Sequence, residues 1–297
     1  MREITLSAIN WLKFIALGSI WGTSFLWIKI IVQEISPFTL VALRVSFALL
    51  TLLIFSLITH QRFSFGSRWW VFLVLGGFNM AFPFMLISWA ELHIPSAIAA
   101  ILNGTPPLFT IIFSSIFLAD DRFTWRKFLG LIVGFSGVLI LMSNQLGNGL
   151  SSYTMGLIAM LIATMFYGGS SVFARKFTKG FPAITQALGQ QLGANIIIWP
   201  IALFGQKQFV LPILPRTWIA LAILGIVCTG LATTIYYSLL HSVGPTKTMM
   251  TNYIFPIVGA ILGLIFLGEP FEWQMVVGCI VIIGGVIIVN WQKTVKS

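Results

Sequence analysis

The sequence carries one polar pattern three times inside apolar stretches, an asparagine four residues ahead of a proline. The pairs are Asn79 and Pro83, Asn103 and Pro107, and Asn252 and Pro256. Proline has no N–H, so a helix loses the hydrogen bond to the carbonyl four residues back, which here is the asparagine's own carbonyl. In lipid, this carbonyl and the side-chain amide would both lack partners. The pattern therefore indicates either bonding to a neighbouring helix or the lining of a polar cavity.

Arg44 is a cation within an apolar stretch, seven residues beyond Pro37. By helical rise it lies about 10 Å below the outer end of its helix. An arginine costs roughly 2.5–3.5 kcal/mol at the centre of a membrane helix, and less if the side chain snorkels. Two roles stay open. The guanidinium can contact an anionic group of a bound molecule, or it can reach the outer headgroups or pair with Glu34 or Glu91.

An aromatic residue, a small residue, a hydroxyl and a cation occur twice at the same spacing. The two copies are Trp21-Gly22-x-Ser24-x4-Lys29 and Tyr167-Gly168-x-Ser170-x4-Arg175. Gly22 allows another helix to approach closely, and Lys29 can snorkel to the outer boundary. Trp21 and Tyr167 can line a pathway with their large faces and polar tips, or they can serve packing alone.

These polar residues must be positioned by membrane helices, because the composition lies outside the soluble range. Of the 297 residues, 58% are hydrophobic and 8% are charged, and the mean hydropathy is +0.99. A hydrocarbon core of about 30 Å needs roughly 20 apolar helical residues. The sequence thus predicts an all-α, polytopic membrane protein with ten transmembrane helices. They lie near residues 11–32, 37–58, 69–90, 96–118, 126–143, 153–174, 182–204, 217–239, 247–267 and 272–291.

The cations lie mainly in the short links between these spans. The net charge of +10 is therefore a topology signal and does not indicate a nucleic-acid surface. Ten spans place both termini on one side, where the links hold thirteen lysines and arginines against three in the opposite links. By the positive-inside rule we expect both termini in the cytoplasm and the chain in the inner (plasma) membrane.

The first half of the chain recurs in the second half. Further matches pair Pro37 with Pro182, Arg68-x-Trp70 with Arg216-x-Trp218, Asn103-x3-Pro107 with Asn252-x3-Pro256, and Trp125-x4-Gly130 with Trp273-x4-Gly278. Each copy holds five spans, within residues 11–143 and 153–291. Because five is odd, the second copy enters the membrane from the opposite face. The sequence therefore predicts an inverted repeat, with a site at the interface of its two copies.

Four segments resemble a known family: SIWGTSFLWIK, ISPFTLVALRVSFALL, IFLADDRFTWRKFLGLIVGFSGVLIL and, in the second half, LGEPFEWQMVVGCIVIIGGVII. They are similar to the two EamA domains of the drug/metabolite transporter superfamily, from about residue 14 to residue 290. The resemblance implies a ten-helix exporter of metabolites, amino acids or drugs with a central cavity between the repeats. Gly189 occupies the position of Arg44 in the second copy. Any role of Arg44 is therefore asymmetric.

Two more groups of polar residues are expected at helix contacts. The seventh span has four polar side chains that should face inward and bond to neighbouring helices, at Gln186, Gln190, Gln191 and Asn195. Asp120 and Glu269 occupy equivalent ends of the fourth and ninth spans. We expect each to pair with a nearby arginine or lysine, with gating as the alternative.

Motifs of other function classes are missing from the sequence. A G-x-x-x-x-G-K-[ST] loop does not occur, which argues against direct ATP coupling. No acidic residue lies in mid-span, so facilitated diffusion and proton antiport both stay open. An intramembrane lipid-modifying enzyme is the alternative function, yet H-E-x-x-H and G-x-S-x-G are absent and the histidines lie in links. A packing or assembly subunit is a third possibility.

The sequence thus predicts a secondary transporter, not an enzyme, that uses no cofactor or metal. Cys228 and Cys279 are expected to pack as small hydrophobic side chains. The expected partners are a small-molecule substrate and the lipid bilayer, with no nucleic acid, and the chain is a monomer or homodimer. The candidate substrate-binding residues, expected to line a cavity between the repeats, are Trp21, Ser24, Arg44, Asn79, Asn103, Tyr167, Ser170 and Asn252.

Overall fold

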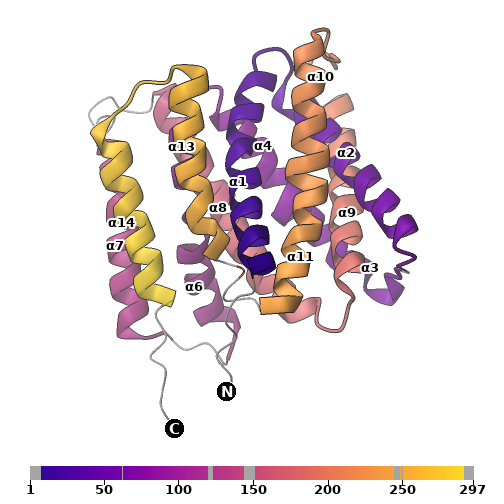
Figure 1. Cartoon of the computed structure of the whole chain (residues 1–297), viewed down its shortest axis with the longest axis horizontal. Coiled ribbons are helices and arrows are strands. Elements are labelled where there is room, and N and C mark those ends of the chain that lie inside the picture. The colour runs from indigo at the N-terminus through magenta and orange to yellow at the C-terminus, as the bar shows by residue number, and fades with distance from the viewer. Residues whose placement is uncertain are drawn as a thin grey trace.

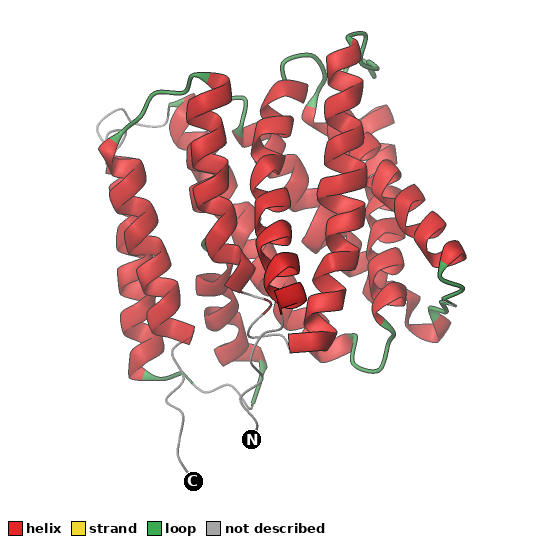
Figure 2. Ribbon diagram, viewed as in Figure 1, coloured by secondary structure: helices red, strands yellow, loops and turns green. Residues whose placement is uncertain are grey.

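A computed structural model describes residues 8–61, 63–119, 123–143, 151–243, 248 and 250–290. Within these ranges every regular element is a helix and no strand occurs (Figure 2). The first half contains α1 (Ala8–Ile31), α2 (Pro37–Ile58), η1 (Gly66–Arg68), α3 (Trp69–Gly76), η2 (Gly77–Ala81), α4 (Phe82–Ala90), α5 (Ser96–Leu102), α6 (Pro106–Phe117) and α7 (Trp125–Met142). The second half contains α8 (Ser152–Phe177), α9 (Ala183–Phe204), α10 (Pro215–Ala222), η4 (Ile223–Leu231), α11 (Ala232–Val243), η5 (Met250–Tyr253), α13 (Ile254–Leu267) and α14 (Trp273–Asn290).

Eight helical stretches among the described residues are long and apolar enough to cross a membrane. They are Ala8–Ile31, Pro37–Ile58, Gly66–Ala90, Ser96–Phe117, Trp125–Met142, Ser152–Phe177, Ala183–Phe204 and Pro215–Leu240. Two shorter apolar helices follow, Thr251–Leu267 and Trp273–Val289. The all-α, polytopic membrane architecture is therefore confirmed. The count of ten spans stays a prediction.

The helices depart from α geometry where the Asn-x3-Pro patterns lie. The third stretch becomes π-helical at η2, which contains Asn79. The fourth stretch breaks between α5 and α6, just after Asn103, because Pro106 and Pro107 have no N–H to donate. Asn252 lies in η5, a 3-10 turn that runs into α13. The expected disturbance of the helix is thus present at all three patterns.

A second π-helical segment, η4, lies in the eighth stretch and contains no proline. Thr229 Oγ1 donates to the Leu224 carbonyl five residues back, at 2.8 Å. This side chain therefore helps to satisfy a carbonyl where the regular α pattern is lost. η4 is the counterpart of η2 in the other half, because Gly77, which begins η2, matches Gly225 of η4 in the sequence repeat.

Two carboxylates, those of Glu269 and Glu34, accept hydrogen bonds from backbone N–H groups at the starts of helices that are distant in the sequence. Glu269 accepts hydrogen bonds from the Ser96 and Ala97 backbone N–H groups at 2.6 and 2.9 Å, where α5 begins. The expectation that Glu269 pairs with arginine or lysine is therefore wrong, because the unbonded N–H groups of a helix start are its donors. Glu34 similarly accepts from the Leu214 N–H at 2.9 Å, ahead of α10. The matching Asp120 lies outside the described residues.

Glycines bring α7 and α14 together at one end of the molecule (Figure 1). A Cβ added to Gly285 would lie 2.4 Å from the Gly134 backbone nitrogen, and a Cβ on Gly137 would lie 2.8 Å from the Ile282 nitrogen. Neither position has room for a side chain. The two helices therefore meet backbone to backbone, as small residues permit in membrane helices.

Contacts between the two halves occur in corresponding sets. α1 packs on α13 and α8 on α6, while α2 packs on η4 and α9 on η2. Two further contacts, α2 with α9 and α7 with α14, join helices that match one another in the sequence repeat. The largest buried cluster includes residues from both halves, so the two copies share one core.

Candidate transport site at the interface of the two halves

Arg44 lies inside the helix bundle, with 6% of its surface exposed. Its Nε donates to Thr229 Oγ1 in η4 at 2.9 Å, and its guanidinium carbon is 3.7 Å from the centre of the Phe84 ring on α4. Glu34 is bonded at the start of α10 instead, and the carboxyl oxygens of Glu91 have no hydrogen-bond partner. The expected pairing with either glutamate is therefore absent. Arg44 is placed where three helical segments meet.

Ser170, Asn79 and Gln190 form a chain of hydrogen bonds across three helical stretches. Ser170 Oγ on α8 donates to Asn79 Oδ1 in η2 at 2.8 Å, and Asn79 Nδ2 donates to Gln190 Oε1 on α9, also at 2.8 Å. Ser170 and Gln190 are both buried. The structure thus brings two predicted site residues together, and it satisfies both ends of the Asn79 amide.

Trp21 and Tyr167 lie among the partly buried residues around the main core. The Trp21 ring on α1 is 5.9 Å from the Tyr236 ring on α11, measured between centroids. Tyr167 on α8 lies within electrostatic range of the Arg44 guanidinium. Tyr167 therefore approaches the buried cation, whereas Trp21 packs against an aromatic side chain of the eighth stretch.

Several buried polar atoms of the first half have no hydrogen-bond partner. They include Ser24 Oγ and Trp27 Nε1 on α1, and Asn103 Oδ1 at the end of α5. Leaving such an atom unbonded costs about 1–3 kcal/mol, so each one favours a water molecule or a polar solute. Asn252, the counterpart of Asn103, is partly buried in η5. α1, α5 and α13 contact one another, so these groups lie on neighbouring helices.

Polar residues of the seventh stretch, α9, meet the expectation in part, because Gln186 donates to the Phe181 carbonyl just ahead of the helix and not to a neighbouring helix. Ser46 Oγ donates to Asn195 Oδ1 at 2.8 Å, and Asn195 Nδ2 donates to the Val45 carbonyl at 3.2 Å. Interhelical bonding is therefore confirmed at Asn195, and also at Gln190. Gln191 departs from the expectation, because it is fully buried and neither end of its amide has a partner.

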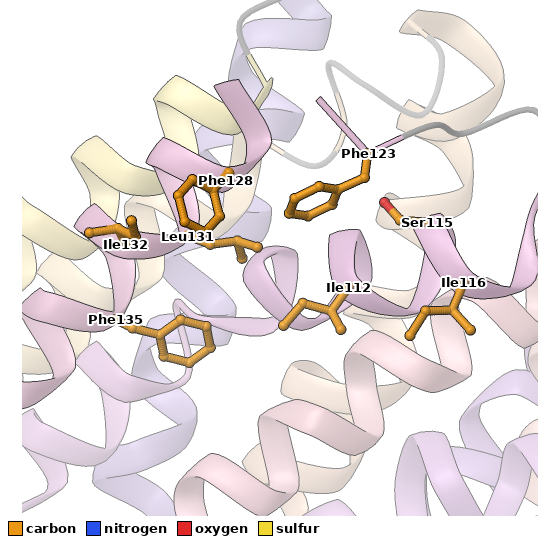
Figure 3. Close-up of a pocket in the computed structure, with 8 residues that line it drawn as sticks. All are labelled: Ile112, Ser115, Ile116, Phe123, Phe128, Leu131, Ile132 and Phe135. Carbon is orange, nitrogen blue, oxygen red and sulfur yellow. The ribbon is translucent and has the colours of Figure 1, made fainter. Parts of the chain in front are cut away.

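A groove of about 630 Å³ lies between α6 and α7, away from these polar groups. Figure 3 shows its lining residues, which are Ile112, Ser115, Ile116, Phe123, Phe128, Leu131, Ile132 and Phe135. The lining is apolar except for the Ser115 hydroxyl, and it contains none of the predicted site residues. A wall of this kind offers little to hold a polar solute, so we do not assign the groove to the site.

A cavity of about 350 Å³ does include a predicted residue, Ser170. Its other lining residues come from α3, η2, α6 and α8, and they are mainly phenylalanine and aliphatic side chains. Neither this cavity nor the larger groove contains Arg44 or Asn103. A common cavity for all the predicted residues stays a prediction.

Sequence reasoning missed both contacts of Arg44. Phe84 is one of 26 phenylalanines, and its place directly after Pro83 does not predict a contact with an arginine of another helix. Thr229 is a hydroxyl residue in an apolar stretch, which is a signal that several other positions share. Cys228, the preceding residue, is a free thiol with its sulfur 3.4 Å from Thr23 Oγ1. In the described part of the chain, no group of three His, Cys, Asp or Glu side chains is placed to hold a metal ion.

Comparison with known proteins connects this arrangement to membrane transport. The uncharacterized inner membrane transporter YedA of Escherichia coli K12 is 28% identical over 94% of this chain and 89% of its own length. A probable terminal-alkyne amino-acid exporter of Streptantibioticus cattleyicolor is 25% identical over 72% of this chain and 71% of its own length. A solved crystal structure, 20% identical, matches with a TM-score of 0.65 over 95% of this chain and 97% of that one, and shows the fold alone.

The profile of the EamA-like transporter family matches the chain twice, at residues 9–143 and 154–291. These two matches lie on the two halves whose helices pack in corresponding sets. They confirm the resemblance inferred from the sequence. The chain is a multi-pass membrane protein that belongs to the EamA-like transporter family and has its two-repeat architecture.

Proposed function

We propose that this chain is a secondary transporter that exports small metabolites, such as amino acids or drugs, by alternating access. Ten spans form two inverted five-helix repeats, residues 11–143 and 153–291, which move against each other. Both termini face the cytoplasm, and the chain works in the inner (plasma) membrane as a monomer or homodimer. Amino acids enter the proposal through the relative named as a probable amino-acid exporter.

The corresponding contacts of the two halves support the inverted repeat. A half-turn that exchanges the halves carries the α1–α13 contact onto α8–α6, and it returns α2–α9 and α7–α14 to themselves. The π-helical segments η2 and η4 correspond in the same way. Inverted repeats of this kind are typical of carriers that open one site to each side in turn.

The observation that carries the proposal is the set of unsatisfied polar groups where the halves meet. Arg44 has Thr229 as its one hydrogen-bond partner among the described residues, although a guanidinium has five N–H donors. A carboxylate or another planar anion can bind these donors in bidentate geometry. Ser24 and Asn103 add unpaired oxygens that can accept from a polar solute.

Three further residues are proposed as walls of the same pathway, Trp21, Tyr167 and Asn252. Asn79 and Ser170 bond to each other, so a direct role in binding requires those bonds to open. The proposed site is therefore an arginine with nearby hydroxyl, amide and aromatic groups. It suits a small solute with an anionic end and an apolar body.

Purified protein in liposomes tests this function. Vesicles are loaded with a mixture of labelled amino acids or with labelled drugs, and efflux is compared with that from protein-free vesicles. We expect protein-dependent efflux of chemically unchanged solute, accelerated by unlabelled solute on the opposite side. Chemically altered product would favour the alternative, an intramembrane lipid-modifying enzyme. Efflux equal to that of empty vesicles for every solute would contradict the proposal.

A further inference from the structure

Glu91 is the one acidic side chain that is fully buried in the described residues. It directly follows α4, and its backbone N–H donates to the Ile87 carbonyl at 3.0 Å. The sequence places it in a link, where a carboxylate would meet water. The fold instead covers it completely, so a carboxyl group lies in the interior at the end of the third stretch.

The Glu91 carboxyl group has no hydrogen-bond partner at either oxygen. Lys29 is close, but its ammonium donates to the backbone carbonyls of Glu91 and Ile94, the latter at 2.9 Å. Arg44 lies within electrostatic range and bonds to Thr229. A lone carboxylate is strongly disfavoured where water is excluded. Burial without a hydrogen-bond partner therefore favours the neutral carboxyl group, which holds a proton.

The charged groups around Glu91 come from several elements. They are Lys29 on α1, Arg44 on α2 and Glu269 in the link before α14. His93 lies in the same turn and packs against Trp89, with 4.5 Å between ring centroids and 60° between the ring planes. α8 meets this turn at Gly156, which has no charge. Glu269 is held by the start of α5, so the two cations are the groups that can stabilise an ionised Glu91.

We propose that Glu91 is a proton-binding site whose proton is exchanged for the ammonium group of an exported zwitterionic solute. This inference rests on the proposed transport function and adds the solute class and the coupling ion. The solute carboxylate binds Arg44, and its ammonium group approaches Glu91. The O–H bond of Glu91 breaks, the proton leaves to water, and the resulting carboxylate pairs with the ammonium group. After the solute departs, a proton from water returns to the carboxylate.

Exchange of this kind keeps Glu91 from becoming a lone buried ion. The group carries a proton when the site is empty and an ammonium partner when the site is occupied. Both conditions avoid the cost of an unpaired charge in a medium of low dielectric constant. The exchange also couples solute export to proton entry, because the same carboxyl group binds one or the other.

Infrared difference spectroscopy of purified protein at neutral pH tests the site through the carbonyl stretch of a protonated carboxyl group. We expect this band in the wild type and its loss in Glu91→Gln. The matched control is Glu34→Gln, which should retain the band, because Glu34 is bonded to N–H groups at the start of α10. A mixture of zwitterionic amino acids should abolish the wild-type band and release protons, measured with a pH indicator in weak buffer.

In liposomes, a proton gradient should drive accumulation of the amino-acid mixture by the wild type and by Glu34→Gln. Glu91→Gln should lose this accumulation and keep exchange of labelled for unlabelled solute. A wild type without the infrared band, or a folded Glu91→Gln that retains it, overturns the proposal. If the wild type transports amino acids without releasing protons, the proton exchange at Glu91 is wrong and the transport function remains supported. If the wild type transports none of them, both the exchange and the transport function are wrong. If Glu91→Gln does not fold, a wild-type band that amino acids leave unchanged overturns the proposal.

Discussion

Two groups of buried polar residues in this bundle differ in how completely they are bonded. In the chain from Ser170 through Asn79 to Gln190, both ends of the Asn79 amide have partners at 2.8 Å. Ser24 and Asn103 have buried oxygens without partners. A bonded chain holds helices together and gains little from a guest, whereas an unbonded group is stabilised when water or solute arrives. The contrast separates residues that hold the fold from residues that are free to bind.

The largest expected effect is that of Arg44→Gln on the binding of solute. The amide can still bond to Thr229 but has no charge, and a hydrogen bond to a charged group is worth about 1.5–3 kcal/mol. Binding of anionic and zwitterionic solutes should therefore weaken about tenfold to a hundredfold, and neutral solutes should change less. Concentration-dependent efflux from liposomes measures this difference. An equal loss for all solutes would indicate that Arg44 only positions its helix.

Asn79→Leu breaks the bonded group. It leaves Gln190 Oε1 without its Asn79 donor, at about 1–3 kcal/mol for a buried unsatisfied group. The Ser170 hydroxyl keeps its bond to the Tyr167 carbonyl at 3.0 Å. We expect a lower melting temperature in detergent, while the protein that stays folded transports at nearly the normal rate. An unchanged melting temperature together with a large loss of transport would move Asn79 into the binding group.

Asn103→Leu makes the complementary change. Leucine keeps a similar volume and removes an amide oxygen that has no partner, so the melting temperature should not fall. Transport should fall about fivefold if the solute loses one neutral hydrogen bond worth about 1 kcal/mol. Asn252→Leu is the matched variant in the second half. If both Leu variants transport every identified substrate at the original rate, these amides are structural.

The smallest effect is expected at Glu34, outside the spans. Hydrogen bonds from the Thr217 hydroxyl, and then from the Leu214 and Ile213 N–H groups, hold the pKa of this carboxyl below its ordinary value of 4.5. Its contribution to stability is therefore present above pH 4.5 and is lost as the pH falls through the lowered pKa. Melting temperatures of the wild type and Glu34→Gln should differ slightly at neutral pH and converge in acid. A gap that widens in acid would contradict this account.

Helix positions could be predicted from the sequence because bilayer thickness sets the length of each apolar stretch. The three Asn-x3-Pro patterns likewise mark places where helix geometry changes, since the effect of proline on the backbone is local. The pattern does not predict which asparagine side chains find hydrogen-bond partners. Asn79 meets partners from two other helices, while Asn103 meets none for its oxygen, although both precede proline by four residues.

Features that depend on packing between distant segments could not be predicted. Thr229 reaches Arg44 only because η4 lies against α2. Glu91 looks like a link residue in the sequence, and its burial follows from how the neighbouring helices pack over the turn. No local pattern reports such long-range contacts. Glu91 lies between two expected spans, so the absence of acids in mid-span gave no indication of a buried carboxyl group.

Access to Asn103 from the two sides of the membrane tests alternating access most directly. Asn103→Cys is introduced into a chain that carries Cys228→Ser and Cys279→Ser, which removes both native thiols. A membrane-impermeant thiol reagent is then applied to either face of sealed, oriented vesicles. The account predicts labelling from both faces, slowed from both by zwitterionic amino acids. Labelling from one face only, with or without amino acids, would contradict it.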